Sequence, residues 1–286
     1  MSRKKQRDKA PQQGAVMRLI DRALLSHLRA IDEEYIDPKR TSDGKILFSV
    51  YASCLLLFAL NYVVLDLEFQ RKVAGWLVRR LGLWNSDGHG ITRNEMRLTM
   101  RIAWTLGCFT LYLIIPTFLH VFILKRPLKD MGLGLRGFVK HSWIYALLFL
   151  PVFISVFVVS HDEAFQSTYP FYRNPESWKH LLAWEAFYGL QFLSLEYFFR
   201  GFMLNELKYR LGWRAVLFMI VPYCMIHFSK PSLEAAGSII AGTVLGFLAL
   251  RTKNIWGGVS IHVAVAWSMD ITSLWQRGWF DRISGN

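Results

Sequence analysis

The sequence predicts an all-α fold, a polytopic transmembrane helix bundle of about seven spanning helices. Its 286 residues are 53% hydrophobic and 15% aromatic, which is too apolar for an ordinary soluble domain. The apolar residues come in blocks of about twenty, and such a block suffices to cross a hydrocarbon core about 30 Å thick. The net charge of +13 comes from Lys and Arg gathered in the N-terminal tail and between the blocks, as in the cytoplasmic loops of membrane proteins. These three observations favour a membrane protein over a nucleic-acid-binding one.

The chain divides into a basic cytoplasmic N-terminal tail, residues 1–45, and a helical membrane domain, residues 46–286. Apolar residues at helical spacing over 16–36 predict a short amphipathic helix on the membrane surface. The alternative for this tail is a soluble regulatory or nucleic-acid-binding role. We expect no cleavable signal peptide, because the first apolar block begins only near Ile46.

Seven apolar blocks define the predicted spans. The second contains Pro116, which neighbouring helices can accommodate within a membrane. The fourth is about 40 Å long, which exceeds the hydrocarbon thickness alone. Between the first and second spans, apolar and basic residues alternate over 66–100, which indicates an interfacial helix. The predicted spans are 46–65, 102–124, 142–160, 181–209, 213–228, 233–250 and 255–274.

The distribution of Lys and Arg predicts that the N-terminus is cytoplasmic. Three basic segments, 125–140, 205–214 and 251–254, then face the cytoplasm, while the acidic segment 161–177 lies outside. The 66–100 connection disagrees, because it is rich in Arg and Lys and yet falls on the outer side. Three agreeing segments outweigh it.

The most informative stretch lies inside the fourth block, where Glu196 and Arg200 interrupt a run of Trp, Phe, Leu and Tyr. Residues four apart lie on one face of a helix. An ionisable group at membrane depth costs at least about 2.5 kcal/mol and usually marks a functional site. The alternative is a buried ion pair that only locks two helices together.

Four more polar residues stand at membrane depth: His227 ends the fifth span, Glu234 opens the sixth, and His262 and Asp270 lie in the seventh. The last two are two helical turns apart and so lie on nearly the same face. Counted from the cytoplasmic ends of their helices, Glu196 and His227 both lie about 20 Å deep. Helix packing alone explains the small residues of the sixth span, but not this set of polar ones. We therefore expect one site that gathers Glu196, His227 and part of the seventh helix.

Such a set admits three chemistries. A carboxylate and a histidine around a water form a general-base arrangement for peptide hydrolysis, and a second histidine can donate to the oxyanion. The same groups could hold Zn²⁺, with His227, His262 and a carboxylate as ligands and a water in the fourth position, although no HExxH spacing favours this. The third is a proton or ion path in a transporter, against which there is no inverted repeat. The three cysteines all fall within apolar blocks, so neither a disulfide framework nor a thiolate metal site is expected.

The motifs resemble those of the CPBP (CAAX protease and bacteriocin-processing) family of intramembrane proteases, also called the Abi or type II CAAX prenyl endopeptidase family. That family carries EExxxR on one helix, FxxxH on the next and HxxxN or a relative on a later one. Here the first motif reads LEYFFRG at 195–201, the second runs from Tyr223 to His227 with Tyr in place of Phe, and the last histidine is His262. The resemblance covers about residues 125–275.

Two positions depart from the family's pattern. The first Glu of EExxxR, which the family uses to activate water, is Leu195 here, and the Asn of HxxxN is Ala266. The chain is then either a catalytically inactive relative, acting as a membrane binding or immunity protein, or an enzyme in which other carboxylates take these roles. Those carboxylates are Glu196, with Glu234 as the substitute base, and Asp270.

The resemblance implies a glutamic-type intramembrane endopeptidase without a cofactor, zinc remaining the alternative. Glu196 would be the base on water, and Arg200 would hold the carboxylate or the helix end. His227 would orient the water or shuttle the proton, and His262 would stabilise the oxyanion. Asp270 would fix the tautomer of a histidine.

The implied partners are the lipid bilayer and a membrane-anchored protein or peptide substrate, with no nucleic acid. The Phe-Phe-Arg-Gly, Lys-Pro-x-x-Glu and His…Met-Asp pattern resembles a bacterial branch of the family, which implies an integral protein of the bacterial inner (cytoplasmic) membrane. The family's members cleave C-terminal sorting tags, process bacteriocins or serve as immunity proteins. The sequence does not choose among these substrates.

Overall fold

The computed structural model describes residues 25–84, 90–173 and 175–284. These residues form helices and connecting turns, with no strand among them, so the all-α prediction is confirmed. Among the described residues, four helical segments are long and apolar enough to cross a membrane, and the predicted number of about seven is not confirmed. The four segments are Asp43–Val64, Arg93–Ile123, Leu128–Val159 and Ser232–Thr252.

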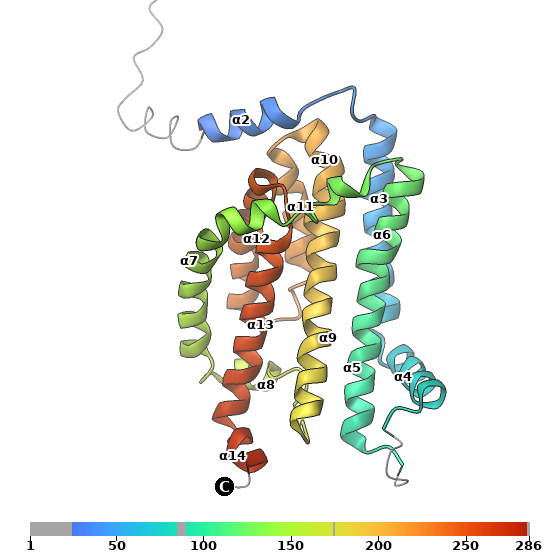
Figure 1. Cartoon of the computed structure of the whole chain (residues 1–286), viewed down its shortest axis with the longest axis vertical. Helices are drawn as coiled ribbons and strands as arrows, with labels where there is room; N and C mark the ends of the chain where they lie inside the picture. The colour runs from blue at the N-terminus through green and yellow to red at the C-terminus, as the bar shows by residue number, and fades with distance from the viewer. Residues whose placement is uncertain (1–24, 85–89, 174, 285–286) are drawn as a thin grey trace, which may run out of the picture.

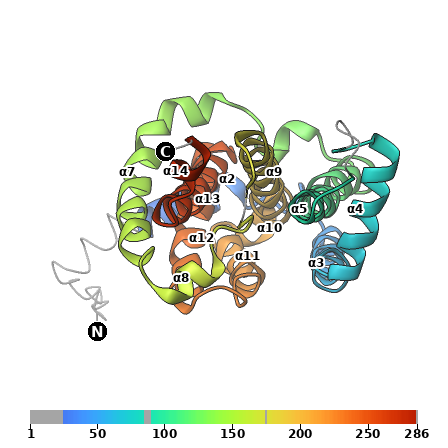
Figure 2. The ribbon, with the colours of Figure 1, turned by 90° about the horizontal axis from the view of Figure 1, so that it is seen from below.

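Most of the long helices run along one axis of the molecule (Figures 1 and 2). Helices α3, α4 and α5 form a group on one side, and α5 packs on α9; on the other side α7 packs on α13, and α11 packs on α12. The helices in chain order are α2 (Ser26–Tyr35), α3 (Asp43–Ala59), α4 (Leu67–Leu81), α5 (Arg93–Phe109), α6 (Ile115–Phe118), α7 (Arg136–Val159), α8 (Glu163–Thr168), α9 (Trp178–Glu196), α10 (Leu204–Leu211), α11 (Arg214–Met225), α12 (Ser232–Thr252), α13 (Trp256–Gln276) and α14 (Trp279–Ser284).

Shorter helical turns connect or extend several of these helices. Four of these turns are π-helical, and the one directly before α7 is a 3₁₀-helix. They are η2 (Leu60–Val64), η3 (Thr110–Ile114), η4 (Leu119–Ile123), η5 (Leu128–Met131) and η6 (Tyr197–Met203).

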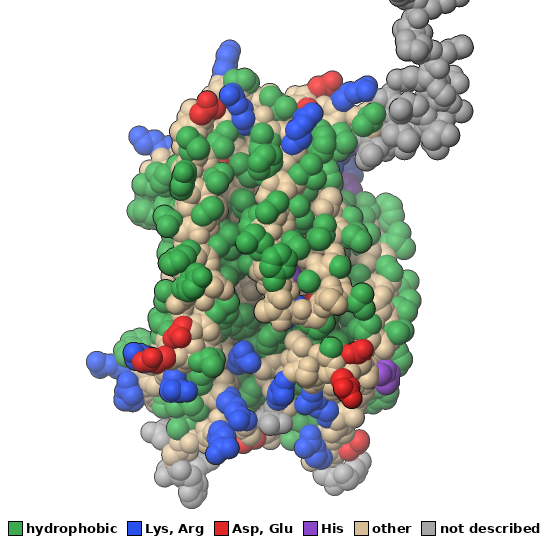
Figure 3. Space-filling model, turned by 180° about the vertical axis from the view of Figure 1, so that it is seen from behind, with side chains coloured by type: hydrophobic (Ala, Val, Ile, Leu, Met, Phe, Trp, Pro, Cys, Tyr) green, Lys and Arg blue, Asp and Glu red, His purple; other side chains and the backbone are tan. Residues whose placement is uncertain are grey.

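The face of the bundle seen in Figure 3 is apolar over its middle and charged at both ends. Large side chains such as Tyr51, Leu55, Phe122, Trp143 and Ile240 are at least 64% exposed. An apolar surface of this extent marks contact with another apolar phase rather than with water. The band therefore fits a lipid environment, with the charged ends at the two membrane surfaces.

Polar caps explain why two helices begin earlier than their apolar blocks. The Ser42 side chain accepts a hydrogen bond from the Lys45 amide, so α3 starts three residues before Ile46. Thr92 and Glu95 form a capping box, so α5 starts at Arg93, well before the predicted span at 102. A cap satisfies amide groups that the first turn leaves without partners. Length alone therefore does not set the helix boundaries.

The fifth predicted span, 213–228, is wrong in length. Helix α11 has only 12 residues, which is about 18 Å and too short for a hydrocarbon core of about 30 Å. The chain turns after Met225 and enters α12 at Ser232. His227 and Lys230 therefore sit in a turn between two helices.

Helix α2 lies across one end of the bundle, beside α10 (Figure 1). Its Asp32 side chain accepts from the Trp213 amide and pairs with Arg214 at 2.9 Å, and Ile31 is buried. Only 26–35 of the amphipathic helix expected over 16–36 can be compared, because 16–24 lie outside the described residues. We call this end, which also carries the 125–132 and 251–255 segments, the basic end.

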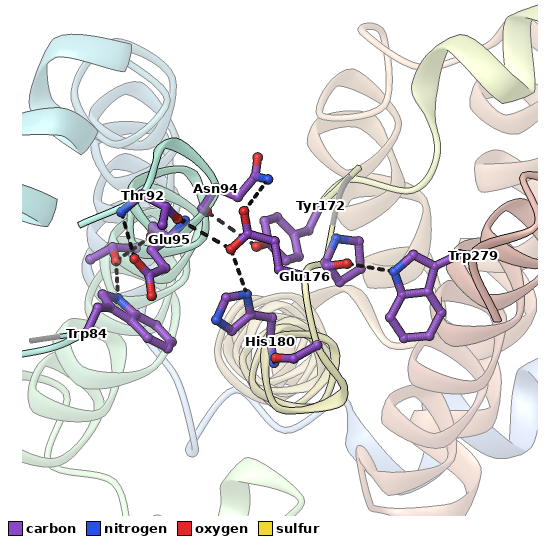
Figure 4. A network of polar contacts seen from close by, with 11 residues as sticks. Trp84, Thr92, Asn94, Glu95, Tyr172, Glu176, His180 and Trp279 are labelled. Atoms are coloured by element: carbon purple, nitrogen blue, oxygen red, sulfur yellow. Dashed lines mark hydrogen bonds and ion pairs between the residues drawn. The ribbon is translucent and has the colours of Figure 1, made fainter. Parts of the chain in front are cut away.

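At the opposite end a polar network joins the start of α5 to the start of α9 (Figure 4). The Glu176 carboxylate accepts from the Asn94 amide at 2.7 Å and from the Thr92 hydroxyl at 3.4 Å. His180 lies 4.0 Å from the same carboxylate. These bonds fix where α9 begins and therefore the height at which Glu196 sits in the bundle.

Candidate active site

Glu196 is the last residue of α9, and the helix continues without a break through η6 into α10. Glu196 is fully buried and Arg200 is 4% exposed. The guanidinium Nη1 donates to Glu196 Oε1 at 2.8 Å, as the spacing of four residues predicts. The π-helical turn that follows Glu196 is a feature found frequently at functional sites.

His262 of α13 completes a three-residue contact around this carboxylate. Its Nδ1 lies 2.9 Å from Glu196 Oε1 and 3.2 Å from the Gly258 carbonyl oxygen. Two acceptors face Nδ1, so this nitrogen carries the hydrogen. One carboxylate oxygen is therefore held by donors from two helices.

Gly258 permits the close approach of α13 to the carboxylate. A Cβ built at this position would overlap Glu196 Oε2 and lie 2.5 Å from Cδ. The helix can present the His262 ring to Glu196 at this distance only because position 258 has no side chain.

Tyr223 of α11 holds the other side of the His262 ring. Its hydroxyl lies 2.8 Å from His262 Nε2. With the ring hydrogen on Nδ1, the hydroxyl donates to Nε2. The Arg200 guanidinium lies over the Tyr223 ring at 4.4 Å and also donates to the Gly242 carbonyl oxygen of α12. Side chains and backbone of four helical segments thus meet at one buried site.

The second oxygen of the carboxylate is free. Glu196 Oε2 is buried and has no hydrogen-bond partner among the described residues. Leaving such an atom without a partner costs several kcal/mol unless water or a ligand supplies the bond.

His227 lies next to this group but does not bond to the carboxylate. It follows α11, and its Nδ1 bonds to the Tyr223 carbonyl oxygen at 2.8 Å. The centres of the Tyr223 and His227 rings are 4.9 Å apart. The His227 Nε2 has no partner among the described residues and stays available to water or substrate.

Asp270 and Glu234 belong to a different network, which corrects the role given to Asp270. Trp184 Nε1 donates to Asp270 Oδ2 at 2.7 Å, and the Phe171 amide donates to Oδ1 at 3.4 Å. The carboxylate therefore does not fix a histidine tautomer; for His262 that is done by Glu196 and Gly258.

Glu234 is held by a tyrosine and a lysine rather than placed beside Glu196. Tyr169 donates its hydroxyl to the Glu234 carboxylate at 2.8 Å, and Lys230 lies 3.7 Å from it. Lys230 also donates to the Tyr169 oxygen at 3.1 Å and lies 3.9 Å from the centre of the Phe171 ring. The substitute base of the sequence analysis is thus already engaged.

The two departures from the family's motifs are both apolar packing positions. Leu195 is 5% exposed and belongs to the large core cluster that contains Phe198 and Phe199. Ala266 is 3% exposed and packs with Trp184 and other aromatic residues. Neither position places a polar group beside Glu196.

Sequence reasoning missed two contributors to the site and one further buried carboxyl. Position 223 is Tyr where the family's FxxxH has Phe. This substitution adds a hydroxyl group and was the feature of the sequence that could have indicated a polar contact there. Nothing in the sequence singles out Gly258 among its neighbours. Glu185 of α9 is 7% exposed, and neither of its carboxylate oxygens has a hydrogen-bond partner among the described residues. It lies within the fourth predicted span.

The residues proposed as zinc ligands do not form a metal site in this arrangement. Within the described ranges, no group of three or more His, Cys, Asp or Glu side chains could hold a metal ion. Both nitrogens of His262 are engaged, by Glu196 and Gly258 on one side and Tyr223 on the other.

Comparison with known proteins gives one match. Residues 176–268 match the model of the family described as type II CAAX prenyl endopeptidase Rce1-like, and this segment contains Glu196, Arg200, Tyr223, His227 and His262. No curated protein and no solved structure matches the chain. The four apolar helical segments agree with an integral membrane protein. The match supports, over this segment, the resemblance to the CAAX protease and bacteriocin-processing family that the motifs indicate.

Proposed function

We propose that the chain is an intramembrane endopeptidase that cleaves a membrane-anchored protein or peptide with a water molecule activated by Glu196. One observation carries this proposal. Glu196 Oε1 is fixed by Arg200 and His262, while Oε2 is buried and lacks a partner. A carboxylate held at one oxygen and free at the other is suited to bind and deprotonate a water.

In this mechanism Oε2 takes a proton from water as the water oxygen attacks the carbonyl carbon of the scissile peptide bond. The C–N bond then breaks, and the proton passes from Glu196 to the leaving nitrogen. His227 supports the water, because its Nε2 is an acceptor when Nδ1 carries the hydrogen toward the Tyr223 carbonyl. A base placed in this way contributes about 10²–10⁴-fold to the rate.

His262 receives a different role from the one that the family resemblance implies. Stabilising an oxyanion requires a hydrogen on Nε2, whereas a ring hydrogen on Nδ1, between Glu196 and the Gly258 carbonyl, leaves Nε2 to accept from Tyr223. We assign His262 to holding Glu196 in place, with Tyr223 holding His262. No step requires a metal.

A non-catalytic membrane protein of the same family, a binding or immunity protein, is the second candidate. The observation that favours it is Leu195, whose side chain lies in the apolar core at the position of the family's first Glu. The two candidates differ in whether any peptide bond is cleaved.

The deciding experiment measures cleavage of a library of membrane-anchored peptides by purified protein in detergent. Wild type is compared with Glu196→Gln, which keeps the size of the side chain but cannot take a proton. The matched control is Glu68→Gln, which makes the same change at a carboxylate that is 68% exposed on α4. Thermal unfolding of each variant shows whether it is folded.

The glutamate mechanism expects cleavage by wild type and Glu68→Gln, loss of at least about 100-fold in folded Glu196→Gln, and little effect of a strong chelator. Loss with chelator and recovery with Zn²⁺ would overturn it in favour of a metalloenzyme. A fully active Glu196→Gln would move the base to Glu234. Absence of cleavage by wild type across the library supports the non-catalytic candidate.

A further inference from the structure

A cavity of about 190 Å³ opens at the basic end of the bundle and reaches inward to Arg200. Helix α10 provides one wall with Asn205 and Lys208, and the chain between α12 and α13 provides another with Asn254. Helices α2 and α10 lie together at this end (Figure 1). The cavity is therefore placed between helices at the basic end, and Glu196 is not among the residues that line it.

Polar groups without partners line this cavity. Asn205 is 2% exposed, and neither its amide nitrogen nor its amide oxygen has a hydrogen-bond partner in the part of the chain that the structure describes. Arg200 Nε and Asn254 Oδ1 are likewise buried without a partner. An unsatisfied buried polar group costs about 1–3 kcal/mol. Three such groups around one cavity point to a polar ligand that bonds to them.

The charge of the cavity selects an anion. Five cations line it, and three of them have a carboxylate partner: Glu196 pairs with Arg200, Glu34 with Lys253 and Asp37 with Arg40. The other two, Lys129 and Lys208, form no ion pair among the described residues.

Asp130 also lines the cavity and offsets one of these two charges. The ammonium of Lys208 is in contact with the rings of Tyr35 and Tyr209, at 4.8 and 5.1 Å from their centres. Of the two positive charges on Lys129 and Lys208, about one is left without a counter-charge once Asp130 is counted.

We propose that this cavity binds a phosphate group of single negative charge, supplied by the headgroup of an anionic phospholipid or by free phosphate. A tetrahedral phosphate presents acceptor oxygens in several directions, so Lys208, Asn205 and Arg200 Nε can each donate from a different wall. Basic pockets between membrane helices are typical binding places for anionic headgroups. This proposal does not depend on proteolysis, because it concerns binding at a separate cavity.

The test measures binding to the full chain, purified in neutral detergent and stripped of lipid. Phosphatidylglycerol is titrated with phosphatidylcholine as the uncharged comparison, and bound lipid is counted by native mass spectrometry. Inorganic phosphate is titrated separately, and thermal unfolding reports its binding. The variants are Lys208→Gln, Lys208→Arg and Asn205→Leu, with Lys72→Gln as the matched control, because Lys72 is 74% exposed on α4.

Wild type and Lys72→Gln are expected to bind one phosphatidylglycerol in preference to phosphatidylcholine. Lys208→Gln should weaken this binding at least about tenfold, and Lys208→Arg should retain most of it, because the charge is kept. Asn205→Leu should also weaken binding; if that variant fails to fold, the two Lys208 variants decide. If millimolar phosphate does not displace bound phosphatidylglycerol, the ligand of the cavity is the lipid. If only inorganic phosphate binds saturably, the ligand is the free ion.

Two results would overturn the proposal. One is the absence of saturable binding of either ligand to folded wild type. The other is equal affinity of wild type, Lys208→Gln and Lys72→Gln, which would place any bound anion elsewhere.

Discussion

Replacing Gly258 by Ala tests the geometry of the site without changing any of its polar groups. The added methyl would overlap Glu196 Oε2 and lie 2.5 Å from Cδ, closer than side-chain carbons and carboxylate atoms pack. The backbone of α13 resists movement, whereas the carboxylate is the end of a side chain. The carboxylate is therefore the group that shifts.

The size of the effect follows from what holds Glu196. Its Oε1 bonds to Arg200 at 2.8 Å and to His262 at 2.9 Å, and a hydrogen bond to a charged group is worth about 1.5–3 kcal/mol. Losing one of them, together with overpacking of about 1–3 kcal/mol, gives an expected destabilisation of about 2.5–6 kcal/mol. A displacement of about 1 Å at a reacting group can lower the rate 10²-fold, so cleavage should fall by about that factor.

The assay combines unfolding in detergent with cleavage of the best membrane-anchored peptide. The matched control is Gly237→Ala on α12, where an added Cβ meets no atom within 4 Å. That change should stabilise the helix by up to about 1 kcal/mol, because Ala has the higher helix propensity, and should leave cleavage unchanged. Wild-type stability and cleavage in Gly258→Ala would refute the assignment of Glu196 and His262 to one contact.

Two further variants separate the site from its surroundings. Tyr223→Phe removes the donor to His262 Nε2 and should cost about 1–3 kcal/mol of stability and lower kcat/KM about tenfold or more; unchanged kcat/KM would show that Tyr223 does not position His262. Asp270→Asn weakens the bonds from Trp184 and the Phe171 amide and should lower the free energy of unfolding by about 1–3 kcal/mol, while the folded fraction keeps its kcat. A large loss of kcat in folded Asp270→Asn would return that residue to the catalytic group.

The sequence by itself determined the features that depend on neighbouring residues. Long apolar blocks identified most of the helices, because about twenty apolar residues form a helix wherever water is excluded. The contact between Glu196 and Arg200 was predictable for a similar reason, since residues four apart meet on any helix. The order of polar residues also pointed to the family that the match over 176–268 supports.

Tertiary structure decided everything that depends on how one helix is rotated and shifted against another. His262 and Asp270 share a helix face, yet one bonds to Glu196 and the other to Trp184, because two helical turns carry them past different neighbours. Because α11 ends at Met225, His227 lies in a turn. Hydropathy alone does not predict the position of such a turn. Gly258 and the Tyr223 hydroxyl matter only because α9, α11 and α13 meet at one height. Spacing along a chain fixes contacts within a helix, whereas contacts between helices follow from packing, which a single sequence does not state.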